Sequence, residues 1–162
     1  EICACLVGSE MCIRDRKKGG KVFGTFCVYV PDEIVFAADA IATGLCGGSQ
    51  FWVPGGEKVL PANTCPLIKA SVGARLDRTC PFFRIADMYI GETTCDGKKK
   101  AYEILGKDVP MHIMDIPQMK REKDIIKWKE EITDFAKITI FLLILFHISR
   151  MFITLQILYK LL

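Results

Sequence analysis

The sequence GETTCDGKKK, at positions 91–100, stands between an apolar run at 88–90 and a helix-forming segment at 101–105. This pattern predicts a strand that ends at Glu92 and a helix that begins near Cys95. The Cys95 thiol would then lie at the carboxyl end of a strand and at the amino end of a helix. Backbone N–H groups and the helix dipole favour a thiolate there, and the thiolate is the form of sulfur that binds a metal. Cys95 is therefore a candidate metal ligand.

The composition is typical of one globular domain with a sizeable core. The chain has 162 residues, of which 51% are hydrophobic and 25% charged. A net charge of +3 does not indicate a nucleic-acid partner. Eight cysteines occur, but the long apolar segments in the middle of the chain argue against a small secreted disulfide scaffold. No cleavable signal peptide is evident at residues 1–8. We therefore expect metal-binding thiols in a reducing, cytoplasmic compartment.

The amino terminus differs from the middle of the chain. Residues 6–16 read LVGSEMCIRDR, which resembles the translation of a sequencing adapter. We therefore expect residues 1–16 to be foreign to the domain, which sets aside Cys3, Cys5 and Cys12. The alternative is a metal-binding hook at positions 3–5, although a C-x-C spacing is a weak signal.

The carboxyl terminus, residues 138–162, switches abruptly to Ile, Leu and Phe. It is long enough to cross a bilayer, but His147 and Arg150 lie near its middle, where a charge costs about 2.5–3.5 kcal/mol. We favour a frameshift or run-on sequence. A membrane or interfacial helix and a buried native helix are the alternatives. Residues 17–137 then form the domain.

Alternating structure signals run through this domain. Strands are expected at 22–30, 43–46, 87–92 and 109–116, and helices at 32–41, 64–76, from 95 onwards and at 122–137, with a shorter segment from 80 and an ordered loop at 50–63. The strand–helix–strand order at the start implies a right-handed parallel crossover. Together these elements predict an α/β fold: a three-layer, Rossmann-like or flavodoxin-like domain with a mainly parallel sheet. In such folds ligands bind at the carboxyl ends of the strands.

Five central cysteines remain, at intervals of 19, 19, 15 and 15 residues: Cys27, Cys46, Cys65, Cys80 and Cys95. These intervals are too wide for a C-x-x-C zinc hook or a ferredoxin run, but each approximates one structural step. The thiols can therefore converge on one edge of the sheet, where soft ligands suit an iron–sulfur cluster or zinc. The alternative is that some are core residues, since free cysteine is often buried. We favour the core for Cys27, inside an apolar run, and ligation for Cys65 and Cys95.

A set of motifs in the same order resembles one known family. The motifs are GTFCVYVPDEIV at 24–35, LCGG at 45–48, NTCPLIK at 63–69, CPFF at 80–83 and GETTCDGKKK at 91–100. Together they resemble the 2-hydroxyacyl-CoA dehydratase and benzoyl-CoA reductase subunit family, which includes double-cubane-cluster proteins. The resemblance covers residues 21–137 and implies the amino-terminal lobe of such a subunit.

The resemblance implies an oxygen-sensitive cytoplasmic enzyme with a 4Fe-4S cluster. An ATP-dependent iron–sulfur activator protein would supply one electron, and a 2-hydroxyacyl-CoA would lose water through a ketyl radical to give an enoyl-CoA. A second dehydratase subunit would be a partner. Carried onto this sequence, the cluster ligands are Cys65, Cys95, Cys46 and Cys80. Glu33 is an acid/base candidate, and a carboxylate that merely favours a helix amino end is its alternative.

Other functions remain open. Within the family, a double-cubane-cluster reductase of small molecules is the alternative. From another class, the chain could be a non-catalytic thiolate metal-binding or membrane-tethered module. Family subunits carry a second lobe that is not evident after Lys137, so we expect this chain alone to be inactive. The lysines at 98–100 could meet CoA phosphates, but a solvated helix face is favoured. His112 is expected to be a core or edge residue.

Overall fold

The computed structural model describes residues 19–45 and 47–161, with side chains up to Leu145. Within this part of the chain, four parallel strands form one sheet in the order β2-β1-β3-β4. The strands are β1 (Lys21–Thr25), β2 (Ala40–Gly44), β3 (Met88–Glu92) and β4 (Met111–Met114). The expectations for residues 1–16, for Cys46 and for the side chains of His147 and Arg150 lie outside the described part.

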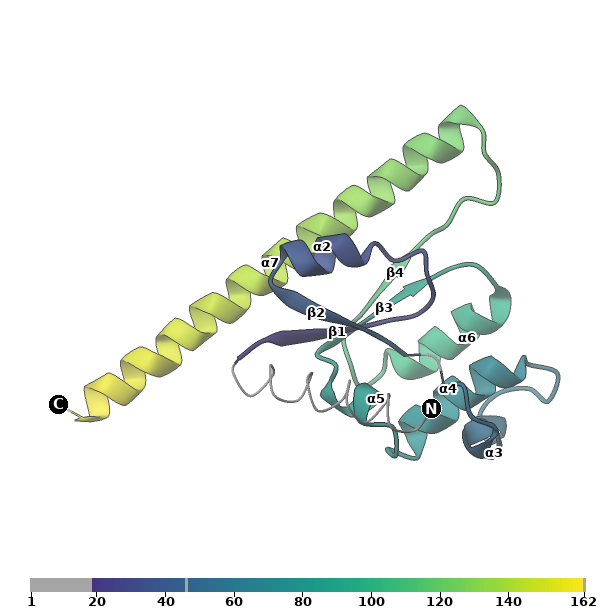
Figure 1. Ribbon diagram of the computed structural model, residues 1–162, viewed down its shortest axis with the longest axis horizontal. Helices are drawn as coiled ribbons and strands as arrows, with labels where there is room; N and C mark the ends of the chain where they lie inside the picture. The colour runs from purple at the N-terminus through teal and green to yellow at the C-terminus, as the bar shows by residue number, and fades with distance from the viewer. Residues whose placement is uncertain (1–18, 46, 162) are drawn as a thin grey trace.

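Helices cover both faces of the sheet (Figure 1). α2 and α7 lie on one face, and α3, α4, α5 and α6 lie on the other. Their bounds are α2 (Asp32–Ala37), α3 (Val53–Glu57), α4 (Pro66–Leu76), α5 (Pro81–Ile85), α6 (Asp96–Leu105) and α7 (Glu122–Leu161), and a 3₁₀ turn, η1 (Gln50–Trp52), precedes α3. The three-layer α/β fold with a parallel sheet is thereby confirmed.

Two hydrophobic cores follow from the alternation of side chains along the strands. Val22 and Tyr89 are fully buried in the core that includes residues of α4, α5 and α6. Phe23 and Ile90, their neighbours in the sequence, are fully buried in the core that includes residues of α2 and α7. Consecutive strand residues point to opposite faces, so a strand covered on both sides is apolar throughout.

The first strand and the first helix are both shorter than the sequence pattern predicts. β1 ends at Thr25, not at residue 30, and Cys27 follows it in a left-handed conformation with φ 73°. α2 ends at Ala37, and Asp39 has φ 52°, which a helix does not tolerate. Ala40 therefore starts β2. The predicted parallel pairing of these two strands is confirmed.

The expectation of a loop at 50–63 is wrong for its first half, where η1 and α3 form. Glycines let α3 pack closely on α4. A Cβ atom on Gly73 would lie 1.9 Å from the Trp52 carbonyl oxygen, and one on Gly56 would lie 2.0 Å from that of Lys69. The glycines that suggested a loop therefore serve a close contact between two helices.

α7 does not end near residue 137 but continues to Leu161 (Figure 1). Phe135 and Thr139 are buried against the domain. Beyond them, Phe141 and Ile144 are exposed as the helix projects past the sheet. Among the described residues, no helix meets both the length and the hydropathy needed to cross a membrane.

Candidate functional site

The strands end together, so the loops that follow them leave from one edge of the sheet. Hydrogen bonds continue past the strand ends: the Leu45 N–H donates to the Thr25 carbonyl oxygen (2.9 Å), and the Thr93 N–H donates to that of Met114 (3.1 Å). Ligands of parallel α/β folds bind at this carboxyl edge. Most of the candidate residues lie in the segments that leave it.

Cys65 and Cys95 lie at the amino ends of two neighbouring helices. Cys65 is the N-cap of α4 and Cys95 the N-cap of α6, and both residues are exposed. The first turns of these helices are in contact, because a Cβ atom on Gly97 would lie 2.8 Å from Cδ1 of Ile68. Within the described residues, neither thiol caps its own helix. The two best ligand candidates therefore lie at adjacent, exposed helix ends.

Cys27 adds a third exposed thiol at the same edge. It follows β1, and its left-handed backbone breaks the extended conformation that the apolar run predicts. It interacts electrostatically with Lys98 and Tyr102 of α6, and Tyr102 also interacts electrostatically with Cys95. The core position favoured from the sequence is therefore wrong for Cys27. A strained backbone in a non-glycine residue is common at functional sites.

Glu92, the last residue of β3, is a fully buried carboxylate that the sequence analysis did not single out. Three donors satisfy it. The Thr94 N–H donates to Oε2 (2.8 Å), the Thr94 hydroxyl donates to Oε1 (3.0 Å), and the Lys98 ammonium forms an ion pair with Oε1. These bonds fix the turn that carries Cys95. An acidic residue at the end of an apolar strand was the available sequence signal.

Electrostatics at this turn favour a charged Lys98. Burial lowers the pKa of Lys98, but hydrogen bonds to Glu92 and Cys27 and their negative charges outweigh burial and raise it above its ordinary value. Burial also raises the pKa of Tyr102, whose hydroxyl donates to the Glu92 carbonyl oxygen (3.2 Å). Lys98 is therefore not part of a solvated face. Lys99 and Lys100 are, since they pair with Asp96 and Glu103 along the helix surface.

A second acidic residue, Asp115, follows β4 at the same edge. Its carboxylate accepts a hydrogen bond from the Thr93 hydroxyl (2.7 Å) and pairs with Lys127 of α7. These hydrogen bonds, that of Lys127 first, lower the pKa of Asp115. The loops after β3 and β4 are thus held together and tied to α7.

The remaining candidates are placed differently. Cys80 is only 8% exposed and belongs to the core with Phe83. It precedes α5, which leads to the start of β3, whereas Cys95 follows the end of that strand. Cys80 therefore lies toward the opposite edge. Cys46 is outside the described residues. Over residues 19–45 and 47–145, whose side chains the structure describes, no three Cys, His, Asp or Glu side chains are grouped closely enough to hold a metal ion.

Glu33 is exposed in the first turn of α2, after the loop that leaves β1. Burial, followed by the charge of Glu33, raises the pKa of the neighbouring Asp32. The exposed Glu33 and the neighbouring Asp32 thus place two carboxyl groups in the first turn of α2.

The fold and these thiols define a parallel α/β domain with candidate thiolate ligands at its carboxyl edge. The family model for 2-hydroxyglutaryl-CoA dehydratase, D-component, matches residues 27–139. The chain is also 41% identical over 123 residues to a protein of Escherichia coli (strain K12) named "Putative dehydratase subunit YjiM". That match covers 75% of this chain and 32% of the relative, so the chain spans about a third of that protein's length. The chain belongs to the 2-hydroxyglutaryl-CoA dehydratase D-component family, and the resemblance noted from the motifs is confirmed.

Proposed function

We propose that this chain is part of an iron–sulfur dehydratase that removes water from a 2-hydroxyacyl-CoA to give an enoyl-CoA. Membership of the dehydratase family supports the reaction class. The observation that carries the proposal is the pair of exposed thiols, Cys65 and Cys95, at the touching amino ends of α4 and α6. Helix amino ends favour the thiolates that iron requires.

The donor chemistry of the edge fits an iron–sulfur cluster in part. Thiolates are soft ligands that select iron–sulfur clusters. Cys65 and Cys95 would hold it from this chain, but the described residues do not complete a ligand set. We therefore propose that further ligands come from Cys46, from a second lobe or from a partner subunit. When bound, a 4Fe-4S cluster supplies one-electron chemistry and a Lewis-acidic iron.

In the proposed reaction, an ATP-dependent iron–sulfur activator supplies one electron to the thioester carbonyl, which becomes a ketyl radical anion. Hydroxide leaves from C2, a proton leaves from C3, and the electron is returned, so the net change is the loss of one water molecule. On this chain, exposed Glu33 is the proposed group that accepts or donates the proton. A reducing cytoplasm would suit this chemistry.

Anaerobic reconstitution with iron and sulfide, followed by metal and sulfide analysis, tests the proposal. We expect Cys65→Ser and Cys95→Ser each to lower bound iron, and Thr64→Ala, beside Cys65, to leave it unchanged. We also expect no dehydratase turnover until a second lobe or subunit is supplied. Iron binding that survives both cysteine substitutions would contradict the cluster, and turnover by the chain alone would contradict its being an incomplete part.

A double-cubane-cluster reductase is the second candidate, and the exposed Cys27 favours it because a larger cluster needs more thiolates. In that case Cys27→Ser would lower bound iron as strongly as Cys95→Ser, and activity would not depend on a CoA ester. For the dehydratase, Cys27→Ser would leave most of the iron bound.

A further inference from the structure

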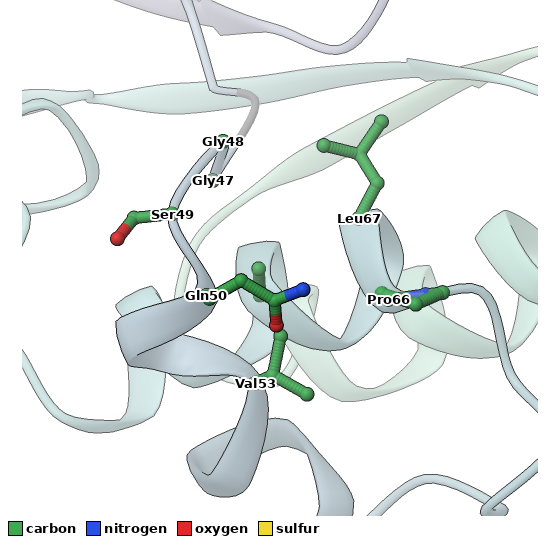
Figure 2. Close-up of a pocket in the computed structure, with 8 residues that line it drawn as sticks. Gly47, Gly48, Ser49, Gln50, Val53, Pro66 and Leu67 are labelled. Atoms are coloured by element: carbon green, nitrogen blue, oxygen red, sulfur yellow. The ribbon is translucent and has the colours of Figure 1, made fainter.

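A cavity of about 210 Å³ opens beside the amino end of α4 (Figure 2). One wall is formed by residues 47–50, which lead into η1, and the other by the first turns of α4. The lining residues are Gly47, Gly48, Ser49, Gln50, Val53, Pro66, Leu67 and Ala70. Pro66 and Leu67 directly follow Cys65, so the cavity adjoins one of the candidate cluster ligands.

Glycine makes this cavity possible and fixes its shape. The Gly47 N–H donates to the Ser71 hydroxyl (3.1 Å), which holds the segment against α4. A Cβ atom on Gly47 would lie 2.7 Å from the Ala70 backbone, so a larger residue would force the two walls apart. A Cβ atom on Gly48 would meet nothing within 4 Å, and the space beside it stays open.

The lining is mostly apolar and carries no charged side chain among the described residues. Val53, Pro66 and Leu67 supply hydrocarbon, and among the described residues that line the cavity none carries a charge. Gln50 extends toward the α4 wall in Figure 2 and adds a polar group, its side-chain amide, to the lining. No charged side chain of the lining offers a carboxylate a counter-ion, whereas an alkyl or aryl group gains contacts with the hydrocarbon of Val53, Pro66 and Leu67.

The nearest lysine on α4 does not supply that counter-ion. Lys69 is 5% exposed, and its ammonium donates to Oε1 of Glu57 and to the Ala62 carbonyl oxygen, each at 2.8 Å. Both bonds turn it toward α3 and the loop after it. Lys69 therefore supports the helix pair instead of serving a ligand in the cavity.

The size of the cavity limits what it can hold. An apolar cavity of roughly 150 Å³ accommodates benzene, so one of this size takes an alkyl or aryl group of about six carbon atoms. We propose that the cavity binds the uncharged side chain of the acyl group and disfavours acyl groups that end in a carboxylate. This inference rests on the proposed function for the thioester, whose reacting end would then lie toward Cys65. The proposed uncharged acyl group differs from a glutaryl group, which ends in a carboxylate and gives the matched family its name.

Titration of the metal-free, ¹⁵N-labelled chain with hexanoyl-CoA, glutaryl-CoA and CoA tests the inference. We expect hexanoyl-CoA to shift the amides of Gly47, Gly48 and Ala70 and to bind about tenfold more tightly than glutaryl-CoA or CoA, since burial of a few methylene groups is worth that factor. Leu67→Trp should fill the cavity and remove this preference. Leu76→Trp, at the other end of α4 and also exposed, should not.

Leu67→Ala provides a second variant should the tryptophan disturb folding, and it should weaken hexanoyl-CoA binding severalfold with no effect on CoA. Equal affinities for hexanoyl-CoA and glutaryl-CoA, shifts that map elsewhere, or no binding by either ester would overturn the inference. Because the titration uses metal-free protein, its result is independent of iron content. Selective hexanoyl-CoA binding without cluster assembly would leave this inference standing and would count against the proposed function.

Discussion

Lys98 reaches back from α6 to form an ion pair with Glu92 across the turn that carries Cys95. The Lys98 side chain is 19% exposed and that of Glu92 is fully buried. The Thr94 N–H and hydroxyl also donate hydrogen bonds to the carboxylate, so an ion pair and two hydrogen bonds together hold the turn. The position of a candidate cluster ligand thus depends on a buried acidic residue in the turn before it.

Lys98→Met should therefore destabilise the domain by about 3 kcal/mol, because it leaves a buried carboxylate without its counter-ion. Urea unfolding measures the change. Lys100→Met is the matched control: its pair with Glu103 is exposed, so we expect a change below about 1 kcal/mol. The double variant Glu92→Met/Lys98→Met should recover part of the loss, since it removes both charges together. A loss no larger for Lys98→Met than for Lys100→Met would contradict this account.

The close contact of η1 and α3 with α4 should make the stability of the domain sensitive to a larger residue at Gly73. Gly73→Ala places a methyl group against the Trp52 carbonyl oxygen, and neither backbone can move without disturbing the core. We expect a loss of about 1–3 kcal/mol in the free energy of unfolding, the range typical of an overpacked site. Gly44→Ala, where an added Cβ meets nothing within 4 Å, should change it by less than about 1 kcal/mol. Equal effects at the two positions would show that steric contact is not the cause.

The stability of the domain should fall as the pH is lowered from about 6.5 to 5, owing to His112. Its ring stacks on Phe135, with centroids 5.7 Å apart, and within the described residues Nε2 has no partner. Burial lowers the pKa of His112, while the charges of Glu131 and Asp134 partly oppose this. The unfolded chain therefore takes up the proton more readily in this window, which favours unfolding.

The slope from one such proton is at most about 1.4 kcal/mol per pH unit. Urea unfolding at several pH values should show it in the wild type, and His112→Phe, which keeps a ring on Phe135, should lose that component. Parallel pH profiles for the two proteins would rule out the histidine as the source.

The positions of Cys65 and Cys95 were predictable because their signals are local: an N-cap position, an early proline or acidic residue, and an apolar run nearby. The signals that misled were also local. Cys27 sits in an apolar run, but a single left-handed residue ends the strand before it. The role of Glu92 depends on Lys98, six positions away across a turn, and the helix at 53–57 depends on Gly73 of another helix. No pattern within one element records contacts of this kind.

Cys80 and Cys95 should respond in opposite ways to replacement by serine. Cys80 is buried in the core with Phe83, so a hydroxyl there has no partner and should cost about 1–3 kcal/mol of unfolding free energy. Because Cys80 lies toward the edge opposite the exposed thiols, bound iron after reconstitution should be unchanged. Cys95 is exposed, so Cys95→Ser should leave stability nearly unchanged and lower bound iron. Urea unfolding and iron analysis on the same preparations separate the two effects. Loss of iron from a folded Cys80→Ser variant would instead make Cys80 a ligand and would require the loop before α5 to turn toward the carboxyl edge.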